Sequence, residues 1–174
     1  MTIYVDGYNL IFAASKRMEG FDIKSTKNTD AAREKLLGLL AKFKSLHKDR
    51  ILVFFDGGAE AAHLPRRQMV RGLDVLFSDV HSDADTDIKN AVSHDDNPRN
   101  IRVVTSDMAI RNFVKRYGAT LTESEEFLDE LEERLEESAL PKDEPLEKYE
   151  GKGDGETDFW MGAFGFDKDG KDKK

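Results

Sequence analysis

Three aspartates of this chain each follow a short apolar run rich in residues that favour β-strands. They are Asp6, Asp56 and Asp107, the last standing two positions beyond the run that ends at Thr105. In an α/β fold, the carboxyl ends of parallel strands meet at one edge of the sheet, where such folds bind ligands. A carboxylate beside a buried sheet is costly in free energy unless something pairs with it. We therefore expect a ligand site at this edge.

A second acidic group, with Asp83, Asp85 and Asp87 at alternate positions, opens a predicted helix. Carboxylates that converge repel one another, and a hard divalent cation can hold them ionised. Oxygen ligands with retained water suit Mg²⁺ or Mn²⁺, and such an ion can activate water for attack on a phosphate. Two alternatives stay open here: these acids can be solvated residues favoured by the helix dipole, and Asp6 and Asp56 can be simple turn residues.

The elements that must position these acids alternate along the chain. We expect strands at 3–5, 51–55, 75–78, 101–105 and 119–121. We expect helices at 8–17, at about 29–47, at 84–92, at 108–118 and from Ser124 onward. Thr29 or Asp30 would cap the second of these helices, and Ser106 would cap the fourth. Residues 59–70 show no clear period. The alternation predicts an α/β fold with a doubly wound parallel sheet flanked by helices.

Composition narrows the class of protein. The chain has 174 residues and a mass of 19.7 kDa, enough for one domain with a sizeable core, and it has no cysteine. Disulfides and thiolate zinc sites are therefore excluded. The longest apolar runs are too short to cross a membrane, and Met1 and Thr2 lead directly into the first predicted strand. We expect a cytoplasmic protein with no secretory segment and no membrane contact.

Charge divides the chain unevenly. Residues 1–119 contain 19 Lys and Arg against 16 Asp and Glu, a balance of +3, whereas residues 120–174 contain 8 against 19, a balance of -11. We predict a domain over 1–139 and a flexible, acidic, disordered tail over 140–174, with an aromatic island at 159–166. The tail is either a modulator of ligand binding by the basic body, with an island that docks a partner, or a passive solubilising segment.

Five short motifs resemble those of the YacP-like NYN domain family, which belongs to the PIN-like nuclease superfamily. They are IYVDGYNLI at 3–11, VFFDG at 53–57, VLFS at 75–78, ADTDI at 84–88 and VTSD at 104–107. The resemblance covers about residues 2–139 and keeps the order of the family's motifs. It implies a PIN-like fold, metal-dependent cleavage of RNA, and partners that include RNA and the ribosome or other translation machinery.

The resemblance also assigns roles by position. Asp6, Asp85 and Asp107 would be the catalytic residues that hold Mg²⁺ or Mn²⁺ and its water, and Asn9 and Ser106 would orient ligands or phosphate. The family often carries a second acid directly after the position of Asp85. Here that position is Thr86, and the next acid, Asp87, is turned by about 100° on a helix. Whether Asp87, or Asp56, adds a further ligand stays open.

Six basic residues are candidates for holding RNA phosphates beside the acidic edge: Arg66, Arg67, Arg71, Arg111, Lys115 and Arg116. A solvated basic face explains them equally well. Ser106 is better placed as a helix cap than as a nucleophile, because no histidine is near it in sequence. Besides the endoribonuclease, the sequence allows a catalytically inactive RNA-binding or adaptor module, or a 5′-nuclease or phosphatase acting on other phosphoesters.

Overall fold

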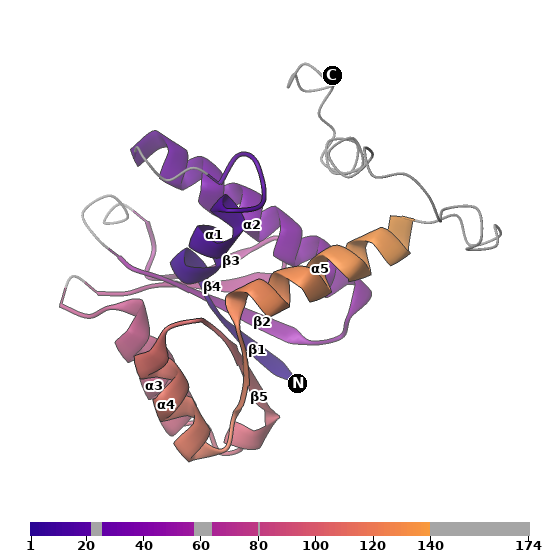
Figure 1. Ribbon diagram of the computed structural model, residues 1–174. Helices are drawn as coiled ribbons and strands as arrows, with labels where there is room; N and C mark the ends of the chain where they lie inside the picture. The colour runs from indigo at the N-terminus through magenta and orange to yellow at the C-terminus, as the bar shows by residue number, and fades with distance from the viewer. Residues whose placement is uncertain (22–25, 58–63, 80, 140–174) are drawn as a thin grey trace. The chain divides into compact units, whose positions relative to one another are not determined.

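A six-stranded sheet lies at the centre of the fold in the computed structural model, which describes residues 1–21, 26–57, 64–79 and 81–139, with the backbone alone for 26–28 (Figure 1). The strand order is β3-β4-β2-β1-β5-β6. The strands are β1 Thr2–Asp6, β2 Arg50–Phe55, β3 Arg67–Val70, β4 Leu73–Phe77, β5 Ile101–Val104 and β6 Thr120–Thr122. β1 lies between β2 and β5, so its last residue, Asp6, stands near the middle of the sheet's carboxyl edge.

Helices cover both faces of the sheet (Figure 1). They are α1 Gly7–Ser15, α2 Thr26–Leu46, α3 Ala84–Ser93, α4 Met108–Tyr117 and α5 Ser124–Ala139, with a short 3-10 turn at Pro98–Asn100. Helices α1, α2 and α5 pack together on one face, and α3 and α4 pack together on the other. The predicted α/β fold with a sheet flanked by helices is confirmed.

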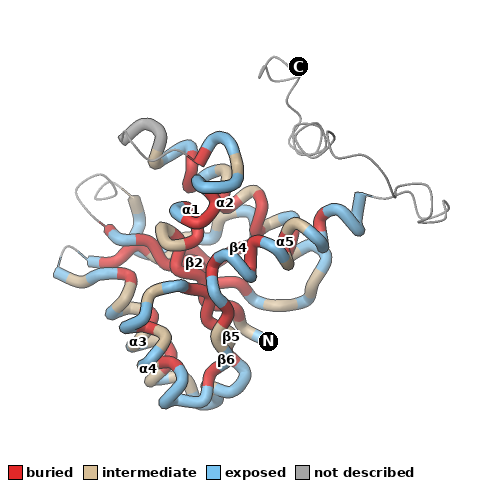
Figure 2. Tube along the Cα trace, viewed as in Figure 1, coloured by how far each residue is buried: buried red, intermediate tan, exposed pale blue. Residues whose placement is uncertain are grey.

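The four inner strands, β1, β2, β4 and β5, are largely apolar on both sides because helices cover both faces of the sheet. Tyr4 and Phe54 meet edge to face at 5.5 Å and pack with Ile88 and Ile110 from α3 and α4. On the opposite face, Phe43 of α2 meets Phe127 of α5 at 5.4 Å. The buried residues concentrate in the sheet and on the inner faces of the helices (Figure 2). This packing makes the strand ends a rigid base for the polar residues that follow them.

Three expectations need correction. Residues 67–70 form β3, an antiparallel edge strand, in a region for which no element was predicted. Exposed and half-buried residues alternate along β3, and Arg67 pairs with Asp74 of β4 at 3.1 Å. Helix α2 begins at Thr26 rather than at a cap by Thr29 or Asp30. The cap of α4 is Asp107, not Ser106, because the Asp107 side chain accepts from the backbone N–H groups of the first turn.

The tail predicted for 140–174 and its aromatic island lie outside the described residues, so the predicted division of the chain stays a prediction. None of the helices in the described part of the chain is both long and apolar enough to span a bilayer.

Candidate active site

Asp6 is a buried carboxylate at the end of β1. Its Oδ2 accepts from Thr105 Oγ1 at 2.9 Å, and its Oδ1 accepts from the Asn9 backbone N–H at 3.2 Å, which also caps α1. The next residue in the chain is Gly7, where a Cβ would lie 2.3 Å from the Phe55 ring. Glycine at this position therefore lets α1 start this close to the sheet. Among the described residues, no basic side chain forms an ion pair with Asp6.

The environment of Asp6 disfavours its charged form. The pKa of the Asp6 carboxyl is raised to about 6, mainly by burial. The hydrogen bonds from Thr105 and Asn9 lower this pKa, whereas the negative charges of Asp85 and Asp56 add to the rise. A buried acid that lacks a basic partner and faces other acids is the arrangement that a bound cation would relieve.

Asp107 stands beside Asp6 through a shared partner. Its Oδ1 accepts from the backbone N–H groups of Ala109 at 2.7 Å and Ile110 at 3.1 Å, so this oxygen caps α4. Its own backbone N–H donates to Thr105 Oγ1 at 3.1 Å, the hydroxyl that donates to Asp6. Thr105 is fully buried, and this single side chain therefore fixes Asp6 and Asp107 relative to one another.

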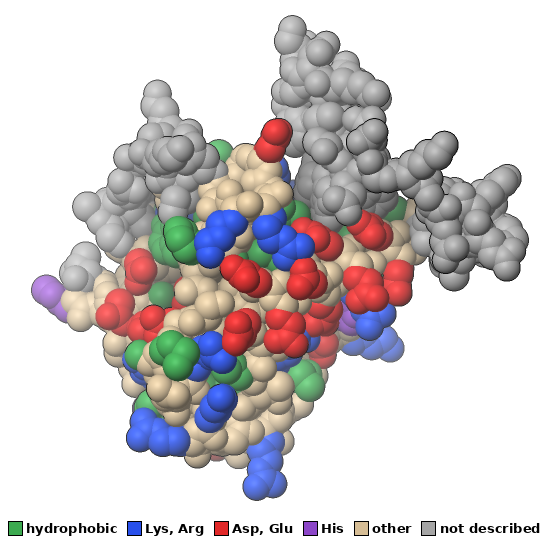
Figure 3. Space-filling view, viewed as in Figure 1, with side chains coloured by type: hydrophobic (Ala, Val, Ile, Leu, Met, Phe, Trp, Pro, Cys, Tyr) green, Lys and Arg blue, Asp and Glu red, His purple; other side chains and the backbone are tan. Residues whose placement is uncertain are grey.

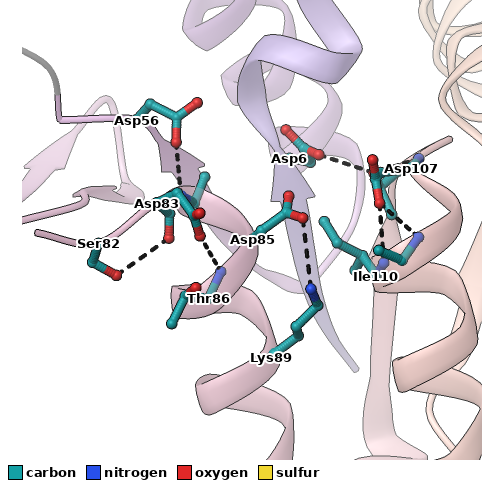
Figure 4. A network of polar contacts seen from close by, with 12 residues as sticks. Asp6, Asp56, Ser82, Asp83, Asp85, Thr86, Lys89, Asp107 and Ile110 are labelled. Atoms are coloured by element: carbon teal, nitrogen blue, oxygen red, sulfur yellow. Dashed lines mark hydrogen bonds and ion pairs between the residues drawn. The ribbon is translucent and has the colours of Figure 1, made fainter.

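Asp85 reaches the same place from α3. It lies in the first turn of that helix, and Figure 4 shows its carboxylate next to Asp6 and Asp107. The pKa of Asp85 is raised, mainly by burial and secondly by repulsion from Asp107. Lys89, whose Nζ lies 3.6 Å from Asp85 Oδ2, lowers it. The structure thus brings together the three acids to which the family resemblance assigned the metal, each from a different element.

The remaining acids have other partners. Asp56 Oδ1 accepts from the Ala84 backbone N–H at 2.8 Å and so ties the end of β2 to the start of α3 (Figure 4). Asp83 caps α3 by accepting from the Thr86 N–H at 2.7 Å, the helix-start role that the alternative interpretation expected. Asp87 turns to Arg66 at 3.8 Å, and its Oδ2 is buried without a hydrogen-bond partner among the described residues.

Asn9 and Ser106 take part in one hydrogen-bonded network with Ser124. Asn9 Oδ1 accepts from the Ser106 backbone N–H at 3.0 Å and from Ser124 Oγ at 2.7 Å, and Ser106 Oγ accepts from the Ser124 N–H at 3.1 Å. These contacts join α1, the loop before α4 and the start of α5. The loop that carries Asp107 is therefore held from both sides.

The six basic candidates do not form one strip. Arg67 pairs with Asp74, and Arg71 pairs with Glu34 at 3.6 Å, both on the β3 side. Arg66 pairs with Asp87, and Arg111 pairs with Glu123 at 2.7 Å. The last two, Lys115 and Arg116, lie in the final turn of α4, at the opposite end from Asp107. Arg66 and Arg111 are thus the two whose partners belong to the elements around the three acids.

The donor set fits a hard divalent cation in its chemistry, because every candidate ligand is a carboxylate oxygen. Across the described ranges, no three such groups are close enough to form a ready-made metal-binding cluster. Mg²⁺ is usually held by one or two carboxylates together with water and substrate oxygens, so a preformed cluster of three is not required. Among these candidate ligands, Asp6 is the buried one, and none of the described basic side chains forms an ion pair with it.

Two residues that organise the site escaped the sequence analysis. Thr105 stands between the strand and the predicted motif residues Ser106 and Asp107, and its polar side chain at the end of a buried run was the signal. Ser124 was predicted only to begin a helix. Nothing in the sequence indicated that it would contact Asn9, 115 positions earlier.

Comparisons with known proteins agree with this geometry. The sequence matches the family described as the YacP-like NYN domain over residues 3–154. Two solved structures of Rae1 (YacP) from Bacillus subtilis are similar to the chain. One, a variant with a tryptophan-to-leucine substitution, has a TM-score of 0.58 and 27% identity, covering 78% of this chain and 79% of that one. The other has a TM-score of 0.59 and 25% identity, covering 79% of each.

A search of curated proteins found no match. The family match spans most of the chain, and the neighbouring structures share its sheet flanked by helices. The chain belongs to the YacP-like NYN domain family, whose fold is that of the PIN-like nucleases.

Proposed function

We propose that this protein is an endoribonuclease that hydrolyses RNA phosphodiester bonds with the help of Mg²⁺ or Mn²⁺. The observation that carries the proposal is the meeting of Asp6, Asp85 and Asp107 at the carboxyl edge of the sheet, with Asp6 buried and without a basic partner among the residues that the structure describes. Membership of a nuclease-fold family supports the same reaction class.

In this proposal the three aspartates hold the cation. When bound, a divalent ion supplies a water of lowered pKa and stabilises negative charge that develops on the phosphate. Asp6 must be ionised to take part, so cleavage requires a pH at which its carboxyl has lost its proton. Thr105 holds Asp6 and Asp107 in a fixed relation, and Asn9 holds the loop that carries Asp107. These residues position the acids and leave Asp107 Oδ2 and part of Asp85 available.

A catalytically inactive RNA-binding module remains a second candidate, and one contact favours it. Lys89 pairs with Asp85 at 3.6 Å and so occupies one of the three acids. The Asp85 side chain is 36% exposed, however, and an ion pair of this kind at a helix surface contributes only about 0.3–0.5 kcal/mol. A divalent cation therefore competes with Lys89 at little cost.

The experiment is incubation of the full chain with end-labelled single-stranded and structured RNAs in Mg²⁺ or Mn²⁺, with an excess of chelator as control. We expect internal cleavage that the chelator abolishes. Asp6→Asn should abolish it as well, while Asp96→Asn, the same change at an exposed position beyond α3, should leave it intact. Cleavage that persists in the chelator or in Asp6→Asn would refute the proposed chemistry. RNA binding without cleavage under all conditions would favour the inactive module.

Two further parts of the proposal rest on the family alone. RNA cleavage in the cytoplasm and association with the ribosome or other translation machinery follow from the resemblance. Co-sedimentation of the tagged chain with ribosomal particles in a cell lysate tests the association. A chain found entirely in the particle-free fraction would remove it.

A further inference from the structure

Arg111 lies one helical turn beyond Asp107, the cap of α4. Side chains four positions apart share a face of a helix, and long helical side chains lean toward the N-terminus. The Arg111 backbone N–H donates to the Asp107 carbonyl at 3.0 Å, so Arg111 belongs to the first turns of the helix that Asp107 caps. The element that carries Asp107 therefore also carries a basic side chain close to its start.

The partner of Arg111 is Glu123, through a contact of 2.7 Å between Nη2 and Oε1. Glu123 directly precedes Ser124, which binds both Asn9 and Ser106, so the pair lies on the α5 side of the site. Arg111 Nε is buried and has no hydrogen-bond partner in the described part of the chain. The guanidinium therefore uses only part of its donor capacity in this state.

Glu123 is the more readily solvated partner of the pair. Its side chain is 50% exposed, against 22% for Arg111, so the carboxylate can return to water while the guanidinium stays in place. By contrast, the Asp87 side chain that pairs with Arg66 is only 10% exposed. Over the start of α4, acidic and basic side chains lie next to each other at the surface (Figure 3). A phosphate matches the forked guanidinium better than one carboxylate oxygen does.

We propose that Arg111 exchanges Glu123 for a backbone phosphate of bound RNA, so that Glu123 is a built-in competitor that weakens RNA binding. This inference rests on the proposed function for its ligand class, a single-stranded RNA. The exchange brings a phosphate to the α5 side of the site, where Glu123 now sits. In the free protein, the contact with Glu123 competes with RNA for the guanidinium and lowers the affinity for RNA.

The test measures binding of a labelled single-stranded RNA to the full chain by fluorescence anisotropy, with excess chelator to prevent cleavage. Glu123→Gln should tighten binding about two- to fivefold at low salt, with a smaller gain at high salt. Arg111→Ala should weaken binding about tenfold and lower the slope of log affinity against log salt by about 1. In the Arg111→Ala background, Glu123→Gln should give no further gain.

Glu137→Gln is the matched control, because Glu137 is a half-exposed partner of Arg134 on α5 and loses the same charge. We expect less than a twofold change there. Equal tightening by both glutamate variants, or a Glu123→Gln gain that survives without Arg111, would overturn the exchange. If Glu123→Gln binds RNA more weakly and has a lower melting temperature, the contact with Arg111 stabilises the fold and does not compete with RNA. A full chain that binds no RNA would also refute the exchange. If the full chain binds RNA and shows the exchange but never cleaves, only the nuclease proposal fails.

Discussion

Replacement of Asp6 by asparagine should make the folded chain more stable at neutral pH while it abolishes RNA cleavage. In the folded chain the pKa of Asp6 is about 6, against about 3.9 for an unfolded aspartate. A raised carboxyl pKa means that the folded state holds the proton more tightly. The stabilisation that comes from this tighter proton binding is complete below about pH 3.9 and is lost as the pH rises through about 6.

The pKa difference sets the size of the effect. The pKa difference corresponds to about 3 kcal/mol lost by the wild-type chain above pH 7, and roughly half of this is lost between pH 5 and pH 8. Asparagine keeps only one oxygen for the two donors from Thr105 and Asn9, which costs about 1 kcal/mol. We therefore expect Asp6→Asn to raise the free energy of unfolding by about 1–2 kcal/mol at pH 8.

Urea unfolding of both chains at pH 5, 6, 7 and 8, in chelator, measures this difference. The difference in the free energy of unfolding should grow by about 1 kcal/mol from pH 5 to pH 8. Addition of Mg²⁺ at pH 8 should stabilise the wild-type chain and leave Asp6→Asn unchanged. A difference that stays constant with pH would refute the claim that Asp6 is a buried carboxylate held without a counterion.

Three further outcomes follow from the same contacts. Thr105→Val removes the hydroxyl that lowers the Asp6 pKa, so the acid limb of the pH–cleavage profile should move to higher pH and stability at pH 8 should fall by about 1–3 kcal/mol; an unmoved profile would show that Thr105 does not tune Asp6. Asp107→Asn should abolish cleavage, whereas Asp87→Asn should keep most of it because Asp87 turns to Arg66; single-turnover rates compare them, and equal losses would contradict the assignment. Deletion of residues 141–174 should tighten RNA binding at low salt and less at high salt in anisotropy titrations, and identical curves would remove a role for the acidic tail.

Much of the fold could be predicted because its strands are buried on both faces. Runs such as 51–55 are apolar throughout, and each predicted strand is followed by a polar residue at the same sheet edge. The edge strand β3 could not be found in this way. It is half exposed, and it depends on a charge pair between Arg67 and Asp74 that only the folded hairpin brings together.

The sequence was enough to predict which strand ends carry the acids of the site, but not how the side chains around them pair. Sequence placed Asp6 and Asp107 after their strands, and the family motifs pointed to Asp85. Ser106 and Asp107 are both residues that cap helices well, and the choice between them depends on contacts of Ser106 with Asn9 and Ser124, which are distant in sequence. Likewise, the approximately 100° turn between adjacent helical positions left the direction of Asp87 open until Arg66 was located beside it.

The most direct test of the central claim is the dependence of the single-turnover RNA cleavage rate on Mn²⁺ concentration at pH 8. If Asp6 holds the cation, the rate should rise with Mn²⁺ and saturate in the wild-type chain and in Asp96→Asn, with no detectable rise in Asp6→Asn. Cleavage by Asp6→Asn that saturates at the same Mn²⁺ concentration as the wild type would contradict this claim.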